Sequence, residues 1–498
     1  MGIIQKQGVR SSIFLVMGFA IGGLNLLILF PKFFTQEEIG LTRALIDAAT
    51  VLSVLASLGS IPVIYKFYPF YKSHTSEKKN DLPVITFAVS MAGFIMICLV
   101  GHFANDFIVR KLGKSPLFAQ NVHLVYPFTF LMLIFSWMEA FGWSLKRSVS
   151  TNFLKETLVR IITSALILLT GYSVISKFEF INLFTVMYLL PVLILAGILI
   201  TTRQWKFNFT ISKVTRRYGR KMMMFALFVF GATFLNIISR TVDSFMIIGL
   251  KGLAETAVFT YAAYLVAFMD LPLRSINSIA TPVIADSWKE RNYKNIETVY
   301  RKSTITLLMT GLFIFLMVAL NLNNLVLYLG EKWSQVPVIV IIMGIAKLID
   351  LGAGVNGQII ATSSNWKFDF YTNVLLTFLA FPLNFFLIKH FGIVGAAYSN
   401  LVALGIFNLV RFIFLYRMYK WQPYGFPHIK ILFVGLLIFM AVYAVPFLGN
   451  IFIDAAFRCV LFAGFFVPAM LRMNVSEEFN LTANNMMRRA GLRRKRPE

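Results

Sequence analysis

Windows of about 20 apolar residues recur along the whole chain, and this recurrence restricts the possible folds more than any other feature. Each window is long enough to cross the hydrocarbon core of a bilayer as a helix. Backbone polar groups in lipid must be hydrogen-bonded within the protein, and the alternating pattern of a β-barrel is absent. We therefore expect an all-α polytopic membrane protein with about fourteen spanning helices, at residues 11–30, 41–65, 82–103, 122–145, 150–171, 179–202, 222–250, 255–280, 303–329, 336–361, 369–389, 393–418, 429–448 and 451–471.

The composition agrees with this interpretation and excludes a soluble enzyme. The chain is 58% hydrophobic and 14% charged, with a mean hydropathy of +0.74. Soluble domains are about 45–50% apolar and about 25% charged. A net charge of +25 would suggest nucleic-acid binding in a soluble protein. Here the sequence contains no polar domain that could hold such an interface, and we expect no nucleic-acid partner.

The lysines and arginines between the expected helices predict the orientation of the chain. Three strongly basic loops, at 66–80, 203–221 and 286–302, fall on one side of a fourteen-helix arrangement, together with both termini. The loop 104–121 is the one basic loop on the other side. Basic loops face the cytoplasm, so we expect both termini to be cytoplasmic. The apolar run at 13–30 is too long for a signal peptide, and we interpret it as a retained first transmembrane helix.

Charged residues inside the expected helices are the strongest indication of function. A charge at the bilayer centre costs roughly 2.5–3.5 kcal/mol on insertion scales, so such residues must face protein or a water-filled cavity. Most of them form opposite-sign pairs three or four residues apart, which places both members on one helix face. Glu139 and Arg411 lack such a partner and need one from another helix or from a ligand. The expected pairs are Arg43/Asp47, Glu156/Arg160, Arg240/Asp243, Asp270/Arg274, Lys347/Asp350 and Asp454/Arg458.

These pairs permit two interpretations, and the pattern alone does not separate them. Each pair could simply neutralise itself, which we favour for Asp454/Arg458 near the membrane interface. Alternatively, the charges line a wet cavity between two halves of a transporter, where guanidinium groups would bind phosphate oxygens. In this second interpretation the substrate-binding residues are Arg240, Arg274, Arg43, Arg160, Lys347 and Arg411, and the charge-coupling residues are Asp47, Asp243, Asp270, Asp350 and Glu139.

The sequence predicts no metal site and no cofactor. Its two cysteines, Cys98 and Cys459, both lie in apolar runs, and its five histidines have no metal-ligand spacing. Coupling of transport to H+, to Na+ or to the membrane potential stays open.

A faint internal repeat indicates two lobes. Residues 39–64 and 257–284, about 220 residues apart, each carry a charged pair and end in Pro-Val-Ile. Parallel repeats of this kind are related by an axis along the membrane normal. We therefore expect an N-lobe of six helices at 1–205, a C-lobe of six at 206–420, and two extra helices with a basic tail at 421–498. Glycines 352, 354 and 357 in LGAGVNGQ predict a broken helix of the kind that transporters use as hinges.

Three stretches resemble the polysaccharide flippases of the multidrug/oligosaccharidyl-lipid/polysaccharide exporter superfamily. FPLNFFLIKHFGIVGAAYSNLVA (381–403) is similar to the junction of helices 11 and 12 in that family. PKFFTQEEIGLTRAL (31–45) is similar to its first extracytoplasmic loop, and VDSFMIIGLKGLAETAVFTYA (242–262) to its helix 7–8 hairpin. Fourteen helices in 6+6+2 order agree with the resemblance, which extends over nearly the whole chain.

The resemblance implies flipping of a polyprenyl-pyrophosphate-linked oligosaccharide across a bacterial inner membrane by alternating access, for O-antigen, capsule or exopolysaccharide. Its partners would be that glycolipid, membrane lipids and glycan-assembly proteins. The family varies at the positions of the charged residues, so the resemblance does not identify them. Their assignment depends only on their depth in the expected helices and on their spacing.

Three alternatives compete with this function. A cation-coupled multidrug antiporter of the same superfamily would favour an acidic cavity, whereas the deep charges here include about as many bases as acids. A membrane-embedded glycan polymerase or glycosyltransferase would need a large polar loop or an aqueous catalytic cluster, and neither is evident. A scaffold without transport activity would not need so many buried arginines. We therefore expect a transporter and not an enzyme.

Overall fold

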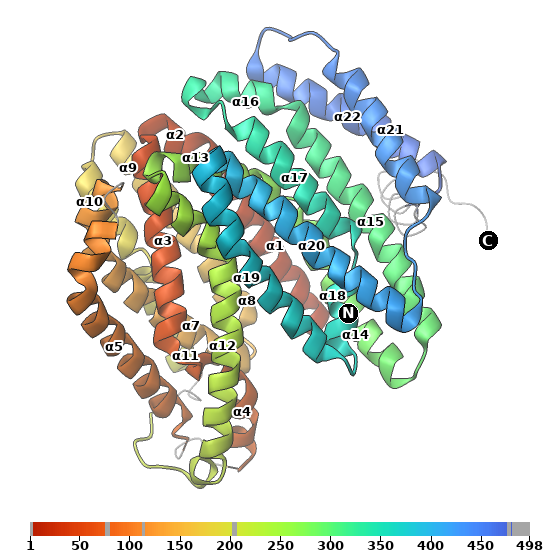
Figure 1. Cartoon of the computed structure of the whole chain (residues 1–498). Coiled ribbons are helices and arrows are strands. Elements are labelled where there is room, and N and C mark those ends of the chain that lie inside the picture. The colour runs from red at the N-terminus through yellow and green to blue at the C-terminus, as the bar shows by residue number, and fades with distance from the viewer. Residues whose placement is uncertain (1–2, 75–79, 112–114, 202–206, 476–479, 481–498) are drawn as a thin grey trace. The chain divides into compact units, whose positions relative to one another are not determined.

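A computed structural model describes residues 3–74, 80–111, 115–201, 207–475 and 480, and these residues form helices joined by short loops (Figure 1). Twelve helices in this part of the chain are long and apolar enough to cross a membrane. A bent pair, Leu253–Ala267 and Asp270–Lys289, makes a thirteenth candidate span, with an angle of 47° between its halves. The expected all-α polytopic class is confirmed.

All fourteen expected segments overlap helices, and the difference in number has a physical cause. Residues 148–171 are helical throughout, as α8 (Ser148–Asn152), the π-helical η4 (Phe153–Leu158) and α9 (Val159–Gly171). Every 18-residue window of this run contains Lys155, Glu156 and Arg160, whereas a candidate span has at most two charged residues. The charges therefore exclude the run from the candidate spans, although its length is sufficient.

The chain divides into two compact units, Met1–Thr260 and Tyr261–Glu498. In the first unit, α3 packs against α5, α7 and α12, and α1 packs against η4. The lobes expected from the repeat, at 1–205 and 206–420, stay a prediction. The helices of the first unit are α1 (Ile3–Leu24), η1 (Asn25–Leu29), α2 (Phe30–Phe33), α3 (Gln36–Ser57), α4 (Ser60–His74), α5 (Leu82–Lys111), α6 (Pro116–Asn121), η3 (Val122–Leu124), α7 (Val125–Ser144), α8, η4, α9, α10 (Lys177–Thr185), α11 (Leu189–Thr201) and α12 (Lys213–Leu250), with α13 (Leu253–Ala267) crossing the boundary.

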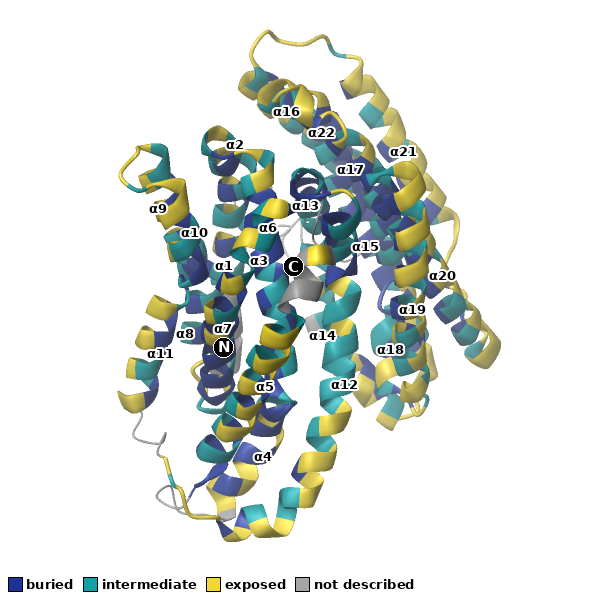
Figure 2. Cartoon of the chain, turned by 60° about the vertical axis from the view of Figure 1, so that its left-hand side comes forward, coloured by how far each residue is buried: buried dark blue, intermediate teal, exposed yellow. Residues whose placement is uncertain are grey.

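In the second unit, α20 packs against α17 and α19, and α15 packs against α14, α17 and α21. Figure 2 shows the buried residues on the inward faces of these helices. The helices of this unit are α14 (Asp270–Lys289), α15 (Tyr293–Leu320), α16 (Leu322–Leu329), η5 (Glu331–Trp333), α17 (Val336–Gly352), α18 (Asn356–Thr362), α19 (Trp366–Phe391), α20 (Ile393–Tyr419), α21 (Phe426–Tyr443) and α22 (Ile451–Arg472).

Helix starts follow from local sequence. Thr35 and Ser176 each accept a hydrogen bond from the backbone N–H three residues on, while Glu38 and Glu179 accept one from the capping residue's own N–H. These reciprocal bonds satisfy backbone donors that would otherwise lack a partner at the helix start. A salt bridge of 2.9 Å between Lys177 and Glu38 connects the two starts.

Both copies of the repeat fold as a helix, a two-residue break and a second helix. In the first copy the break at Leu58 and Gly59 separates α3 from α4, and both residues have a positive φ. In the second copy the break after Ala267 comes earlier, so α13 has 15 residues where α3 has 22.

Close helix packing in the first unit depends on glycine. An added Cβ at Gly18 in α1 would lie 2.1 Å from the Glu156 carbonyl oxygen, and one at Gly40 in α3 would lie 2.0 Å from that of Leu253. Small residues let helix backbones approach each other in membranes, where no hydrophobic force drives helices together. The backbone of α1 therefore lies directly against the charged segment η4.

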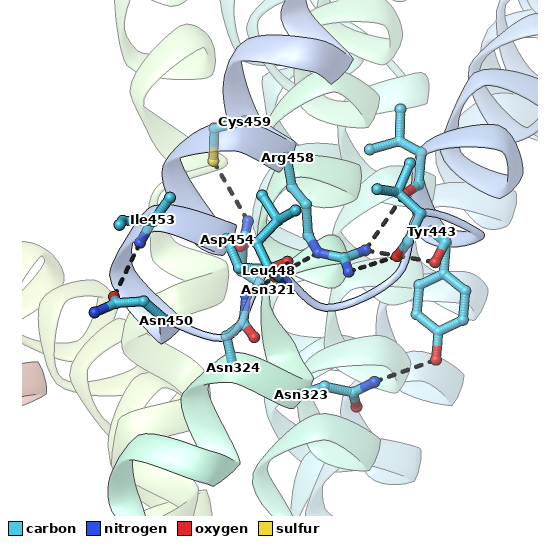
Figure 3. Close-up of polar contacts among 12 residues, drawn as sticks. Asn321, Asn323, Asn324, Tyr443, Leu448, Asn450, Ile453, Asp454, Arg458 and Cys459 are labelled. Atoms are coloured by element: carbon cyan, nitrogen blue, oxygen red, sulfur yellow. Dashed lines mark hydrogen bonds and ion pairs between the residues drawn. The ribbon is translucent and has the colours of Figure 1, made fainter.

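The pair Asp454/Arg458 is structural, as the sequence indicated. Figure 3 shows the Arg458 guanidinium between the Asp454 carboxylate, at 2.5 Å, and the carbonyl oxygens of residues 442, 443 and 445. Asp454 is fully buried and also accepts hydrogen bonds from the Asn324 side chain and the Leu448 N–H. The pair therefore joins the end of α21, the start of α22 and α16.

We predict that Gly18→Ala destabilises the protein by at least about 1–3 kcal/mol, because the new methyl group would overlap the Glu156 carbonyl. Thermal unfolding of the purified protein in detergent measures the effect. Gly197→Ala is the matched control, since α11 leaves its Cβ position open. Equal thermal unfolding midpoints for both variants would show that α1 can move away from Glu156 without loss of stability.

Candidate functional site

Four of the six expected charge pairs are formed, so three- and four-residue spacing predicted most of the local pairing. Their N–O distances are 2.7 Å for Arg43/Asp47, 3.2 Å for Arg160/Glu156, 2.8 Å for Lys347/Asp350 and 2.5 Å for Arg458/Asp454.

The other two expected pairs are wrong. Asp270 makes its ion pair with Lys347, at 2.6 Å, and not with Arg274 on its own helix. The pair Arg240/Asp243 is not among the ion pairs of the described residues. Spacing along one helix cannot reveal a competing partner on a neighbouring helix, and Lys347 is such a partner.

Lys347 is the centre of a charged cluster in the second unit. Its ammonium group lies between two carboxylates, Asp270 on α14 and Asp350 one turn further along α17. Asp350 also accepts a hydrogen bond of 3.1 Å from Asn408 on α20, and Asn408 accepts one of 3.1 Å from Asn356 on α18. The cluster therefore contains two acids and one base at its core, connected by amides to two further helices.

Arg411 on α20 is buried and paired in the same unit. It forms an ion pair with Asp369 on α19 and donates a hydrogen bond of 3.1 Å to the Thr372 hydroxyl. Its guanidinium lies 3.9 Å from the centroid of the Phe407 ring, and a Cβ at Gly357 would lie 2.7 Å from it. The sequence required a partner for Arg411 from another helix or from a ligand, and in the structure it comes from another helix.

The break expected in LGAGVNGQ is present and positions one member of the Lys347 cluster. Gly354 has a φ of +65° between α17 and α18, and an added Cβ would lie 2.7 Å from the Ser303 hydroxyl. That hydroxyl accepts a hydrogen bond from the Val355 N–H freed by the break. Only glycine fits this turn easily, and the turn brings Asn356 to Asn408.

A second cluster lies in the first unit, around the π-helical segment η4. Lys155 in η4 reaches Glu139 on α7 at 2.8 Å, so Glu139 also finds its partner on another helix. The Glu139 side chain is only 5% exposed, whereas that of Lys155 is 40% exposed. Short π-helical stretches are often found at functional sites, because they turn side chains away from the regular helix face.

Arg160 belongs to the same cluster and connects two π-helical segments. It pairs with Glu156, and its backbone carbonyl accepts a hydrogen bond of 2.9 Å from Asn25 in η1. Ser164 donates a bond of 2.6 Å to the Asn25 side chain. Side chains of Arg160 and Glu156 are 28% and 30% exposed, so this pair is accessible.

Arg43 on α3 has Asp47 as its ion-pair partner in the described part of the chain, and its side chain is 37% exposed against 5% for Asp47. Arg240 on α12 and Arg274 on α14 are exposed, and neither belongs to an ion pair in the part of the chain that the structure describes. Of the six expected substrate-binding residues, these two offer a guanidinium that no carboxylate of the described residues pairs with.

Sequence reasoning missed Lys155, Asp369 and the amides Asn25, Asn356 and Asn408. An asparagine inside an apolar helix is a signal that could have identified the amides, because an amide in lipid needs a partner. No group of three or more His, Cys, Asp or Glu residues that could hold a metal ion occurs among the described residues.

We predict that Lys347→Met destabilises the second unit by about 3–5 kcal/mol, because it leaves Asp270 and Asp350 facing each other without a base. The triple variant Lys347→Met, Asp270→Asn, Asp350→Asn should recover most of the loss. Thermal unfolding of the purified protein tests both, with the exposed Lys294→Met as control. Unchanged stability of the single variant would mean that water already screens these charges.

Comparison with known proteins gives a family match for part of the chain and fold matches for nearly all of it. Residues 229–386 match the family model MatE. No curated protein matches the sequence.

Three solved structures show the similarity in fold. A lipid II flippase, MurJ, in an inward closed conformation has 15% identity and a TM-score of 0.68, covering 93% of this chain and 99% of the flippase. An inward-facing multidrug resistance MATE transporter of the MOP superfamily has 14% identity and a TM-score of 0.59, with 80% and 97% covered. A MOP superfamily transporter from Pyrococcus furiosus, whose binding pocket is described as reversed in polarity, has 14% identity and a TM-score of 0.54, with 83% and 95% covered.

The solved structures in these matches are, by name, a flippase and transporters. At such identities they establish the fold. The chain is a multi-pass membrane protein with the fold of the MOP superfamily of transporters.

Proposed function

We propose that this protein flips a polyprenyl-pyrophosphate-linked oligosaccharide from the cytoplasmic to the outer leaflet of a bacterial inner membrane by alternating access. The product would serve the synthesis of a surface polysaccharide such as O-antigen, capsule or exopolysaccharide. The orientation with both termini in the cytoplasm belongs to this proposal. The basic tail from Arg488 onward lies outside the described residues.

The observation that carries the proposal is the exposure of Arg240 and Arg274 inside membrane helices, with no carboxylate paired to either among the described residues. A guanidinium at membrane depth is costly unless water or an anion accompanies it. A pyrophosphate offers several oxygens that a guanidinium group can bind bidentately. The remaining expected bases, Arg43, Arg160, Lys347 and Arg411, are each held by at least one carboxylate.

The paired residues have a different role in the proposal. Pairing keeps each cluster close to neutral before the substrate enters, so that the basic groups do not repel one another. The acids Asp47, Asp243, Asp270, Asp350 and Glu139 would respond to the coupling ion, H+ or Na+, or to the membrane potential. Lys347 suits such a role because it contacts two carboxylates and could favour either.

The fold matches support this substrate class without establishing it. The lipid II flippase covers 93% of the chain, and its substrate is lipid-linked by name. The rival function is multidrug export, which the MatE family match at 229–386 and the MATE structures favour. An export site for cationic drugs needs accessible carboxylates, whereas the guanidinium groups that Arg240 and Arg274 expose are basic.

We predict that Arg240→Ala and Arg274→Ala each reduce flipping of a fluorescent polyprenyl-pyrophosphate oligosaccharide in proteoliposomes by roughly 10–100-fold, the loss expected for one charged hydrogen-bonding group. Lysine at either position should restore part of the activity, since it keeps the charge but not the bidentate geometry. Arg417→Ala, at the exposed end of α20, is the matched control.

The same vesicles distinguish the two candidate functions. Normal flipping by both alanine variants would refute the assignment of these arginines. Export of a cationic dye that is insensitive to either substitution, with no flipping by the wild type, would favour the multidrug transporter.

A further inference from the structure

An apolar groove runs along the first unit between α5 and α12, with α3 and α4 as its floor. Two cavities make it up, of about 430 Å³ and about 290 Å³, and the Leu58 side chain at the α3–α4 break lines both. Both wall helices pack on α3 and on α4. The cavities follow each other along both walls, from Ile85 to Ala104 on α5 and from Thr215 to Phe230 on α12.

Three of the polar side chains that line the groove, those of Ser60, Thr86 and Thr215, are hydrogen-bonded within the protein. The Ser60 hydroxyl is bonded to Ser90 at 2.7 Å. Thr86 donates to the Leu82 carbonyl and accepts from the Trp137 ring N–H. The Thr215 hydroxyl donates to the buried carboxylate of Asp81. Apart from Tyr126, the other residues that line the two cavities are apolar, so most of the surface is hydrocarbon, which an alkyl chain fits better than water does.

The size of the groove fits a single alkyl chain. A cavity of about 150 Å³ accommodates benzene, so the larger cavity has room for on the order of a dozen carbons. From Thr215 to Phe230 the wall rises by about 22 Å at 1.5 Å per residue, which is more than the roughly 15 Å hydrocarbon depth of one leaflet. A transmembrane helix, about 10 Å across with its side chains, is too wide for such a cavity.

One end of the groove is basic. α12 has 38 residues and is about 57 Å long, so it extends beyond the hydrocarbon core, and its first nine residues carry five lysines and arginines. Arg216 and Arg220 precede the groove-lining Met223 and Leu227 by seven residues each, which puts them on nearly the same helix face about 10 Å nearer the end. Arg217 and Lys221 lie on the opposite face, beside the Tyr218 ring.

We propose that this groove binds one acyl chain of an anionic glycerophospholipid, whose phosphate contacts Arg216 and Arg220. Both arginines are exposed, and the acid near this end, Asp81, is buried below Thr215. Since the bilayer is as apolar as the groove, the chain gains mainly packing, and headgroup charge supplies the selectivity. A polyprenyl chain is several times longer and would leave most of its length outside. This inference is independent of the transported substrate.

Native mass spectrometry of the purified full-length protein tests the proposal, with phosphatidylglycerol and phosphatidylcholine of identical acyl chains as probes. We expect the wild type to retain one phosphatidylglycerol and to prefer it by tenfold or more. Arg216→Gln with Arg220→Gln should weaken phosphatidylglycerol binding by roughly 10- to 30-fold. Arg217→Gln with Lys221→Gln removes the same charge from the opposite face and should change binding by less than about threefold.

A second pair of variants tests the position of the acyl chain. Gly219 lines the groove and its Cβ position is open, so Gly219→Leu should fold normally, fill the groove and abolish retention of either lipid. Gly197→Leu on α11 is equally unhindered and should retain both, with thermal unfolding confirming that each variant is folded. Equal retention of the two lipids by the wild type, equal effects of the matched variants, or displacement of phosphatidylglycerol by a polyprenyl phosphate at lower concentration would overturn the proposal.

Discussion

The cost of placing a charge in lipid is the constraint on which the rest of this structure depends. Almost every basic group that lies deep in the described helices is held by a carboxylate, and the pairs also determine which helices meet. Lys347 connects α14 with α17, Lys155 connects η4 with α7, and Arg411 connects α20 with α19. In a solvent where helices gain little from apolar contact, such polar links contribute to packing as well as to charge balance.

The charged residues differ in how completely the protein satisfies them. Among the described residues, the partners of Asp454 and Arg458 lie within α16, α21, α22 and the loop between the last two, and both side chains are buried (Figure 3). Arg240 and Arg274 are exposed and have no ion pair in the described part of the chain. The Lys347 cluster is intermediate, because one base contacts two acids, Asp270 and Asp350. This arrangement would suit a lysine that shifts its ion pair from one carboxylate to the other.

Irregular backbone occurs where the charged clusters lie. The π-helical segments η1 and η4 meet through Asn25 and Arg160, and the glycine break after α17 delivers Asn356 to Asn408. Distorted helices in membranes are tolerated where protein or water satisfies the freed backbone groups, and here side chains such as Ser303 do so. The same physics makes the groove on α12 apolar, since the hydroxyl groups of Ser60, Thr86 and Thr215 are bonded within the protein.

The sequence by itself determined the helical class, the approximate positions of the spans, the break in LGAGVNGQ and four of six local charge pairs. These depend on hydropathy and on spacing along one helix, which a linear sequence records completely. Only the tertiary structure decided that Asp270 pairs with Lys347 and not with Arg274. It also decided that Arg411 pairs with Asp369, that Glu139 pairs with Lys155, and that a groove lies between α5 and α12. Each of those outcomes is a contact between residues distant in the chain, for which the competing partners become visible only when the helices are packed.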